Sequence, residues 1–174
     1  SGAELPFTTT HISAATGLVT WALLETWRDQ KPTAVGMATG AVAGLVGVTP
    51  AAGFVTPGAG MAIGCITALI CYSSIRLKMQ LRFDDSLDTF AVHGVGGTIG
   101  ALLTGVFASQ ELIEGHPAAT ILAEQGRASL IFGQLQAVLV SYGLAAFGTL
   151  IIALAIRQCG IRFRVSEETE NLGV

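Results

Sequence analysis

Charged side chains are scarce in this chain. Only 12% of its 174 residues are Asp, Glu, Lys or Arg, which is about half the share of a typical soluble domain. A water-soluble fold of this size could not cover its surface with so little charge, so the composition excludes an ordinary soluble domain. The hydrophobic share of 51% and the mean hydropathy of +0.64 agree. We therefore expect a protein that lies in a lipid bilayer.

Basic residues and cysteines are also few. Nine Lys and Arg residues face 12 Asp and Glu residues, a net charge of −3, and this balance excludes the basic surface that a nucleic-acid partner requires. Cys65, Cys71 and Cys159 form no CxxC pair and have no metal-site spacing with the histidines. We interpret them as buried small hydrophobic residues. We expect no bound metal, no cofactor and no enzymatic activity.

Long apolar runs are what the sequence does contain. A helix needs about 20 apolar residues to cross a hydrocarbon core about 30 Å thick. The predicted spans are residues 7–27, 33–48, 57–75, 86–108 and 130–156, with a polar loop at 109–128. The predicted fold class is therefore all-α, a polytopic membrane helix bundle with five transmembrane helices. Residues 1–158 would form the membrane domain and residues 159–174 a cytoplasmic C-terminal tail.

The basic residues predict how the bundle is oriented. If the five spans alternate in direction, all but one of the basic residues fall on the same side of the membrane. This set comprises Arg28, Lys31, Arg76, Lys78, Arg82, Arg157, Arg162 and Arg164. Only Arg127 falls on the other side. The positive-inside rule then predicts a multi-pass cell-membrane protein with its N-terminus outside and its C-terminus in the cytoplasm.

Glycine recurs at helical spacing in two of the spans. The second span carries Gly36, Gly40, Gly44 and Gly47, and the fourth carries Gly94, Gly97 and Gly105. Stripes of small residues let the backbones of membrane helices approach closely. We therefore predict that Gly94 and Gly97 are close-packing positions beside a candidate functional residue, His93.

His93 lies within the apolar run DTFAVHGVGGTIG at residues 88–100. At 100° per residue, an α-helix would place Gly97 and Gly100 on the same face as His93, with Thr89 beneath the ring. An ionisable group at this depth is costly unless it has a partner, so it indicates function. Two interpretations remain open on the residues alone. His93 could line a pore and pass a proton, or it could be a neutral imidazole that bridges two helices.

Several motifs resemble one protein family. D-x-F-x-V-H-G-V-G-G-x-x-G-A-L-L-T-G-V-F at residues 88–107 resembles the tenth helix of ammonium transporters of the Amt/Rh superfamily. AxGAxAGLVGVTPAAGFV at residues 38–55 resembles their eighth helix and the turn after it. THISAATGLVTW at residues 10–21 is similar to their seventh helix, and RFRVSEE at residues 162–168 to the start of their tail. The likeness covers nearly the whole chain and favours the bacterial or archaeal Amt type.

The resemblance implies a fold and a site. Family members have eleven helices in two inverted halves, assemble as trimers, and conduct through a pore lined by two hydrogen-bonded histidines. This chain resembles helices seven to eleven, the C-terminal half, and the N-terminal half is missing. His93 matches the second pore histidine, and Thr89 matches a pore-facing position.

Two further residues match the family motif. Asp85 stands eight residues before the histidine, where the family places an aspartate. It could support the inner helix end and a water wire, or it could cap a helix or pair with Arg76 or Lys78. Thr49 matches the threonine of the GVTP turn, and backbone capping at a broken helix is favoured for it over direct contact with the substrate.

Other polar and aromatic residues have plainer interpretations. We expect His11 to form a hydrogen bond at a helix end and His116 to be solvated. We interpret Trp21 as a residue that packs against other helices and Trp27 as an anchor at the membrane interface. Asp88 would point about 140° away from His93 on an α-helix, at about 100° per residue, so we interpret it as structural.

The resemblance implies ammonium or ammonia transport, with two alternatives. The chain could be an ammonium sensor that signals to a cytoplasmic partner, for which the resemblance suggests a PII-type protein, or an inactive structural fragment. The tail residues that could form a docking face, or instead a solvated anchor at the membrane end, are Arg157, Arg162, Arg164, Glu167, Glu168 and Glu170.

Overall fold

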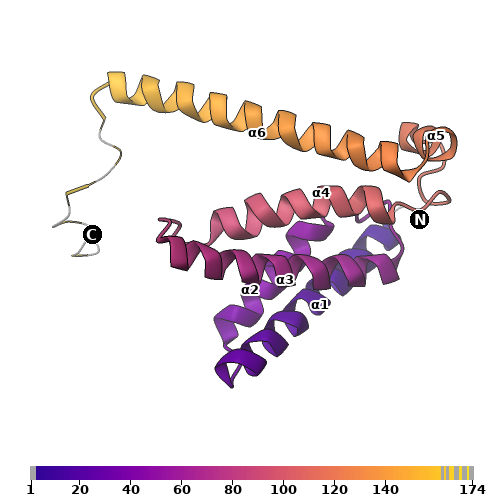
Figure 1. The fold of residues 1–174 in the computed structure, drawn as a ribbon, viewed down its shortest axis with the longest axis horizontal. Coiled ribbons are helices and arrows are strands. Elements are labelled where there is room, and N and C mark those ends of the chain that lie inside the picture. Colours follow the sequence, from indigo (N-terminus) through magenta and orange to yellow (C-terminus); the bar gives the residue numbers. More distant parts are fainter. Residues whose placement is uncertain (1–2, 162, 164, 167–168, 170–171, 173–174) are drawn as a thin grey trace. The chain divides into compact units, whose positions relative to one another are not determined.

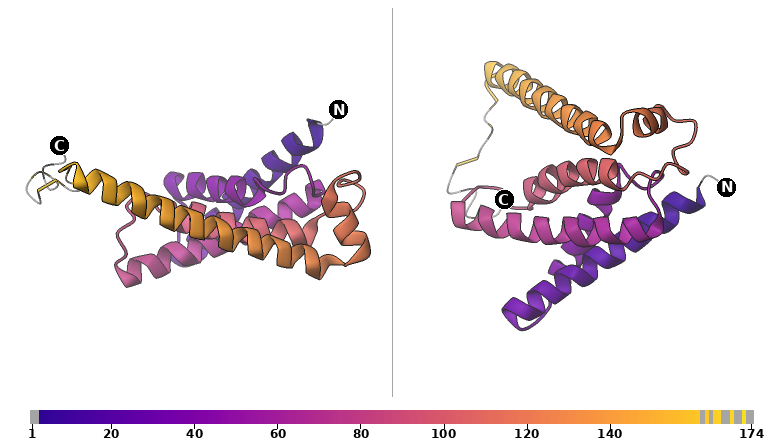
Figure 2. Two further views of the ribbon diagram at one scale, coloured as in Figure 1. Left: turned by 90° about the horizontal axis from the view of Figure 1, so that it is seen from above. Right: turned by 45° about the vertical axis from the view of Figure 1, so that its right-hand side comes forward.

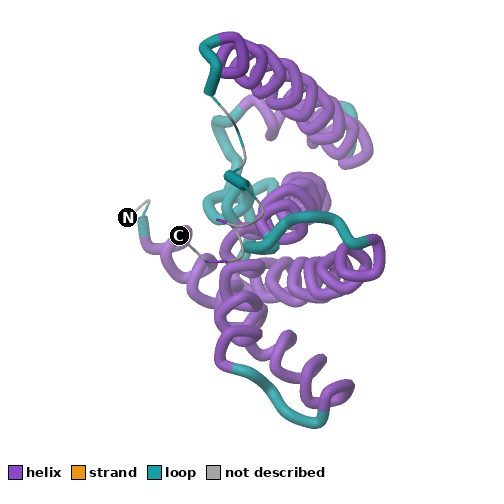
Figure 3. The backbone as a smooth tube through the Cα atoms, turned by 90° about the vertical axis from the view of Figure 1, so that its left-hand side faces the viewer, coloured by secondary structure: helices purple, strands orange, loops and turns teal. Residues whose placement is uncertain are grey.

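The structure, a computed structural model, describes residues 3–161, 163, 165–166, 169 and 172. Every regular element in this part of the chain is helical (Figures 1 and 3). In order they are α1 (Glu4–Asp29), α2 (Ala34–Val48), α3 (Pro57–Leu81), the π-helix η1 (Phe90–Val95), α4 (Gly96–Phe107), α5 (Pro117–Glu124) and α6 (Arg127–Gln158). The all-α fold class is confirmed.

The helices begin and end at residues suited to those places. The Thr33 hydroxyl accepts a hydrogen bond from the backbone N–H of Gly36 at 2.9 Å and so caps α2. Thr56 caps α3 in the same way, with Pro57 as its first residue. Gln30 and Arg82 end α1 and α3 in the left-handed backbone conformation, with φ of 66° and 53°.

Three helices have the length and composition of membrane spans. They are α3, the continuous stretch Phe90–Phe107 and α6, with mean hydropathies of 1.6, 1.5 and 2.2. The other two predicted spans are also helical. However, α2 has only 15 residues, and α1 carries several threonines and two charged residues in its final turn. The count of five spans therefore stays a prediction.

The predicted loop at 109–128 is partly wrong, because it contains the helix α5. The Nδ1 of His116 accepts a hydrogen bond from the N–H of Ala118 at 3.1 Å, and Pro117 opens the helix. Ile121 and Leu122 pack against a buried cluster that includes Ile113. Charged residues on either side of this short apolar segment hid the helix in the sequence.

The chain divides into two compact units, Ser1–Leu135 and Gln136–Val174. The first unit holds α1 to α5 and the start of α6, and the rest of α6 belongs to the second. The sequence predicted a different kind of boundary, at residue 158, between a membrane domain and a cytoplasmic tail. That boundary stays a prediction.

Glycines bring three helices of the first unit into close contact. A Cβ on Gly44 of α2 would lie 2.2 Å from the carbonyl oxygen of Ser13 in α1. A Cβ on Gly100 of α4 would lie 2.3 Å from the carbonyl oxygen of Gly47 in α2. No side chain fits at these distances, so the predicted packing of the glycine stripe in the second span is confirmed. Figures 1 and 2 show α3 and α4 side by side, with α1 and α2 crossing them.

The fourth span contacts its neighbours through glycines other than the predicted Gly94 and Gly97. Gly96 and Gly100 are buried, whereas the atoms nearest to a Cβ on Gly94 belong to the ring of Phe90 in the same helical stretch, at 3.0 Å. The nearest atom to a Cβ on Gly97 is a methyl of Val46 at 4.0 Å. The close-packing role of Gly94 and Gly97 stays a prediction. The spacing of the glycines alone did not predict which of them contact a neighbouring helix in this chain.

A small core fills the space between the helices of the first unit. Trp21 is 4% exposed and its ring meets the ring of Tyr72 edge-on, with centroids 5.2 Å apart. This confirms that Trp21 packs. Cys71 is buried in the same cluster, but Cys65 and Cys159 are exposed. The prediction that all three cysteines are buried is therefore wrong for two of them.

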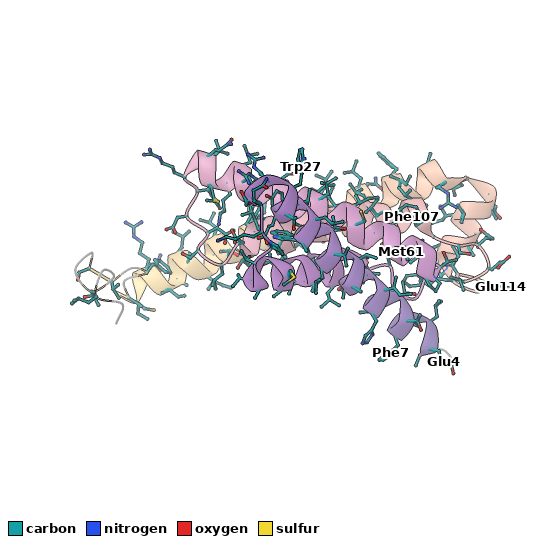
Figure 4. All side chains as sticks on the ribbon, turned by 90° about the horizontal axis from the view of Figure 1, so that it is seen from below. Glu4, Phe7, Trp27, Met61, Phe107 and Glu114 are labelled. Atoms are coloured by element: carbon teal, nitrogen blue, oxygen red, sulfur yellow. The ribbon has the colours of Figure 1, made fainter. Side chains whose placement is uncertain are left out.

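The basic residues of the first unit lie mostly in or just after the C-terminal ends of α1 and α3. In Figure 4, Trp27 lies toward one end, and Glu4, Phe107 and Glu114 lie toward the other. The C-terminal parts of α1 and α3 carry Arg28, Arg76 and Lys78, and they meet around a shared cavity. The membrane orientation predicted from the basic residues stays a prediction.

Candidate functional site

His93 lies on the π-helix η1, which runs directly into α4. The preceding residues Ala91 and Val92 are 2% and 4% exposed, whereas His93 is exposed. The imidazole therefore points away from the packed interior of the first unit. π-turns are rare and occur frequently at functional sites.

His93 and Gly100, which the sequence places on one face, differ in burial. Gly100 is buried against Gly47 of α2, but His93 is on the exposed side. The prediction assumed 100° per residue throughout, whereas the π-turn holds more residues per turn. The common face stays a prediction. Apolar periodicity gives no sign of such a turn.

Asp85 holds the beginning of η1. Its Oδ1 accepts a hydrogen bond from the N–H of Thr89 at 2.9 Å, and its Oδ2 accepts one from the N–H of Phe90 at 3.0 Å. A carboxylate at this place satisfies two backbone donors and is favoured by the helix dipole. Of the alternatives for Asp85, the structure shows the helix cap. Its part in a water wire stays a prediction.

Lys78 links α3 to the segment that precedes η1. Its ammonium group forms an ion pair with Asp88 and also donates to the backbone carbonyl of Asp85. Asp88 has φ of 55° and is half-buried. The structural interpretation of Asp88 is confirmed. The carboxylate partner of Lys78 is Asp88, and the pairing considered for the Asp85 side chain is not formed.

Cys71 contacts the π-turn from α3. Its thiol donates to the carbonyl oxygen of Val92, with the sulfur 3.9 Å from that oxygen, and a Cβ on Gly96 would lie 2.9 Å from the sulfur. Sequence reasoning missed this contact because it treated Cys71 only as a small apolar residue. A signal was present: Cys71 and Lys78 are seven residues apart and so share one face of α3.

Arg127 closes the other end of the helix that carries His93. Its Nη1 donates to the backbone carbonyls of Gly105, Val106 and Ala108 at 3.3, 2.6 and 3.1 Å. A guanidinium at the C-terminus of α4 neutralises the partial negative charge of these carbonyls. The sequence identified Arg127 only as the basic residue on the opposite side of the membrane.

The two threonines of the predicted site lie at helix ends. Thr49 is exposed, and its hydroxyl donates to the carbonyl of Leu45 at 2.7 Å where α2 ends. This confirms the capping interpretation. Thr89 is exposed at the start of η1, on the same stretch as His93, and its contact with a pore stays a prediction.

The remaining histidines have local roles. The Nδ1 of His11 forms a hydrogen bond with the carbonyl of Phe7 at 2.9 Å near the beginning of α1, as expected for a helix end. His116 is exposed, as expected. Trp27 is 79% exposed, and its role as an interfacial anchor stays a prediction. Within the described residues no cluster of His, Cys, Asp or Glu could hold a metal ion.

The arrangement therefore presents one imidazole on the outer side of a helix whose two ends are fixed. Neutral imidazole has one hydrogen-bond donor and one acceptor. Such a group can bind a small polar molecule on one side and a second protein group on the other. The long apolar helices and the glycine-mediated packing define the class of the molecule, a multi-pass helical membrane protein.

Comparisons with known proteins identify the family. The model of the Ammonium Transporter Family matches residues 2–174. The chain is 40% identical over 169 residues to the ammonium transporter of Bacillus subtilis (strain 168), which covers 97% of this chain and 41% of the relative. The crystal structure of Saccharomyces cerevisiae Mep2 is similar, with a TM-score of 0.78 and 33% identity over 96% of this chain and 38% of that one. This chain belongs to the ammonium transporter family.

A second solved structure is also similar. A protein described as a sensor Amt protein has a TM-score of 0.83 and 29% identity, and the likeness covers 98% of this chain and 40% of that one. The chain thus spans about two fifths of the length of its relatives.

Proposed function

We propose that this chain forms one half of a pore that conducts ammonium as ammonia, with His93 as one of its lining groups. The observation that carries the proposal is the placement of His93: it is exposed, although the two residues before it, Ala91 and Val92, are buried. Asp85 and Arg127 fix the two ends of this helix. A second segment of the complete protein would cover the imidazole and close the pore.

The chemistry favours neutral ammonia at this depth. An ion loses its hydration in a hydrocarbon surrounding at a cost far above that of a neutral molecule. Ammonium would give up its proton near the outer end, and ammonia would then pass His93 by hydrogen bonds to the ring nitrogens. The imidazole or an adjacent water would carry the proton. Thr89 would offer a hydroxyl one turn nearer the inner end.

The proposed setting follows from the distribution of charge and from the family. The protein would lie in the cell membrane as a homotrimer, with the basic ends of α1 and α3 in the cytoplasm and the N-terminus outside. The segment that completes each pore would correspond to the N-terminal half of the family fold.

Replacement of His93 in the complete protein tests the proposal. In proteoliposomes, we expect His93→Ala to abolish selective ammonium-driven current, because an apolar side chain cannot hydrogen-bond to ammonia or pass a proton. His11→Ala is the matched control, since His11 contacts only its own helix, through a hydrogen bond to the carbonyl of Phe7 and a ring contact with the same residue. Its current should equal that of the unmodified protein. Unchanged current and selectivity in His93→Ala would refute the role of His93.

A sensor is the second candidate, supported by the likeness to a sensor Amt protein. Such a protein would bind ammonium and pass its occupancy to a PII-type protein at the cytoplasmic face. Most of the tail residues considered for this docking, including Arg162 and Glu167, lie outside the described residues. Uptake measurements separate the two candidates, because a pure sensor binds ammonium without moving it.

The third candidate is an inactive structural fragment. Liposomes that contain only residues 1–174 distinguish it from a self-sufficient transporter. We expect no ammonium-dependent current from this chain alone, because one histidine cannot form the pair and the exposed side of His93 needs a cover.

A further inference from the structure

Lys78 reaches from α3 to the turn that leads into η1. Its side chain is only 14% exposed, and the side chain of Asp88, with which it forms an ion pair, is 32% exposed. Most of the other residues that line its cavity, of about 320 Å³, are apolar, among them Leu77, Phe83 and Phe90. Opposite charges attract more strongly in such surroundings than in water, and separating them would leave a charge without a partner. The pair is therefore suited to keep two segments in one arrangement.

The same ammonium group also contacts the backbone of this turn. It donates to the carbonyl oxygen of Asp85, which accepts the N–H of Asp88 at 3.2 Å as well. Asp88 has φ of 55°, a conformation that is uncommon outside glycine and that persists only where its surroundings stabilise it. The carbonyl of Asp88 in turn accepts the N–H of Val92 at 2.9 Å. Lys78 thus fixes the turn directly before the first residues of η1.

The backbone register of η1 decides how His93 is rotated about the helix axis. η1 is a π-helix of six residues, and it ends where the N–H of Gly96 donates to the carbonyl of His93. A π-turn holds one residue more than a turn of α-helix, so a change to the α-helical register would rotate the start of η1 by about 100° relative to α4. Because π-helices are rare, contacts from outside η1 are needed to maintain this register.

Two side chains on one face of α3 supply such contacts. Cys71 donates to the carbonyl of Val92 within the π-turn, with its sulfur 3.9 Å from that oxygen. Lys78 pairs with Asp88 just before the π-turn. A hydrogen bond between charged groups is stronger than one from a neutral thiol. Lys78 is therefore the stronger of the two contacts that α3 makes with the segment carrying His93.

We propose that Lys78 is a positioning residue for His93. Its bonds to Asp88 and to the carbonyl of Asp85 maintain the π-turn in the register that directs the imidazole toward the pore. Lys78 does not contact the transported molecule and acts through the backbone of η1. The proposal rests on the proposed function of His93 and deepens it, because it names the group on a neighbouring helix that sets the orientation of the ring.

Ammonium-driven current of the complete protein in proteoliposomes tests the proposal. Lys78→Met keeps an apolar stem but removes the ammonium group. We expect it to lower the current at least about tenfold, since a displacement of about 1 Å at a functional group can cost about a hundredfold. Lys78→Arg keeps a charged donor and should retain clearly more current than Lys78→Met. Equal currents in these two variants, or an unchanged current in Lys78→Met, would overturn the proposal.

Arg76→Met is the matched control for the loss of a positive charge from the same end of α3. Arg76 donates to the hydroxyl of Tyr72 at 3.1 Å, and both residues belong to α3. We therefore expect a normal current in this variant. A loss equal to that of Lys78→Met would show that any basic residue at this end of α3 supports the current, and the positioning role would be refuted.

Two spectroscopic measurements separate positioning from simple stabilisation and from a long-range effect of charge. In Lys78→Met, we expect amide hydrogen exchange to rise in η1 and not in α1, and the nitrogen NMR signals of the His93 ring to shift. A contact that only stabilises the fold would leave the ring signals unchanged. Normal exchange in η1 together with a reduced current would mean that the charge of Lys78 acts directly on the ion, which contradicts the proposal.

Asp88→Asn provides a second variant in case Lys78→Met does not fold. Asparagine adopts the left-handed conformation readily, so the turn is kept while the ion pair is lost. We expect a current between those of Lys78→Met and the unmodified protein. The double variant Lys78→Met/Asp88→Asn should conduct no worse than Lys78→Met, because both changes remove the same contact. A normal current in Asp88→Asn, or losses that add in the double variant, would contradict the proposal.

Comparison with His93→Ala distinguishes failure of this proposal from failure of the pore. If His93→Ala keeps its current, the pore role of His93 is refuted. If His93→Ala abolishes the current and Lys78→Met leaves it unchanged, the pore role stands and only the positioning role of Lys78 is refuted.

Discussion

Gly100 of α4 lies against the backbone of Gly47 in α2, so closely that a Cβ on Gly100 would be 2.3 Å from the carbonyl oxygen of Gly47. This contact joins the helix that carries His93 to the glycine stripe of the second span. It therefore fixes the depth and rotation of the candidate site within the first unit.

Substitution at this contact should separate the two helices. We expect Gly100→Val to destabilise the complete protein by about 3 kcal/mol, since overpacking of a tight interface costs about 1–3 kcal/mol and here the backbone itself is the obstacle. Thermal unfolding in detergent measures the effect. Gly97→Val is the control: its nearest neighbour in this chain is 4.0 Å from the added Cβ, and it should be tolerated better. Equal stability of Gly100→Val and the unmodified protein would contradict the contact.

Two substitutions separate the role of Asp85 as a helix cap from the role of its negative charge. Asp85→Ala removes both acceptors for the N–H groups of Thr89 and Phe90, and should lower the free energy of unfolding by about 1 kcal/mol. Asp85→Asn keeps an acceptor, so we expect it to retain most of the stability and most of the ammonium current. A normally folded Asp85→Asn without current would show that the carboxylate acts on the proton or its water and not only on the helix end.

Arg127 should stabilise α4 through its C-terminus. Arg127→Ala leaves the carbonyls of Gly105, Val106 and Ala108 without their shared guanidinium donor. The expected loss is about 2 kcal/mol, typical of a charge-assisted hydrogen bond. Amide hydrogen exchange at the end of α4 should rise more than exchange in α1. Uniform exchange across both helices would contradict a local capping role.

The thiol of Cys71 should be replaceable by a hydroxyl but not by a methyl group. Cys71→Ser keeps a donor toward the carbonyl of Val92, which lies 3.9 Å from the sulfur, whereas Cys71→Ala loses it. We expect Ala to increase hydrogen exchange in η1 and Ser to increase it less. If both variants behaved alike, the thiol would be acting by volume alone.

The sequence predicted the fold class because it depends on apolar run length and on the scarcity of charge. It also predicted the glycine packing of α2, since close backbone approach requires glycine at regular spacing. Both properties are carried by residue types in order along the chain, and neither depends on a distant partner.

The missed features depend on backbone register or on tertiary contact. The π-turn under His93 leaves no mark in apolar periodicity, so the sequence did not predict it. Arg127 and Lys78 act on backbone carbonyls and on a distant aspartate, which only the folded chain brings near. The helix α5 was hidden because its apolar residues are few and lie between charged ones.

The most direct test of the account is an experimental structure of the complete protein in lipid nanodiscs, with attention to the surroundings of the His93 ring. We predict an open passage on the exposed side of the ring, with a second protein segment closing it opposite η1. Acyl chains against that ring, or protein side chains that fill the space beside it, would contradict the pore.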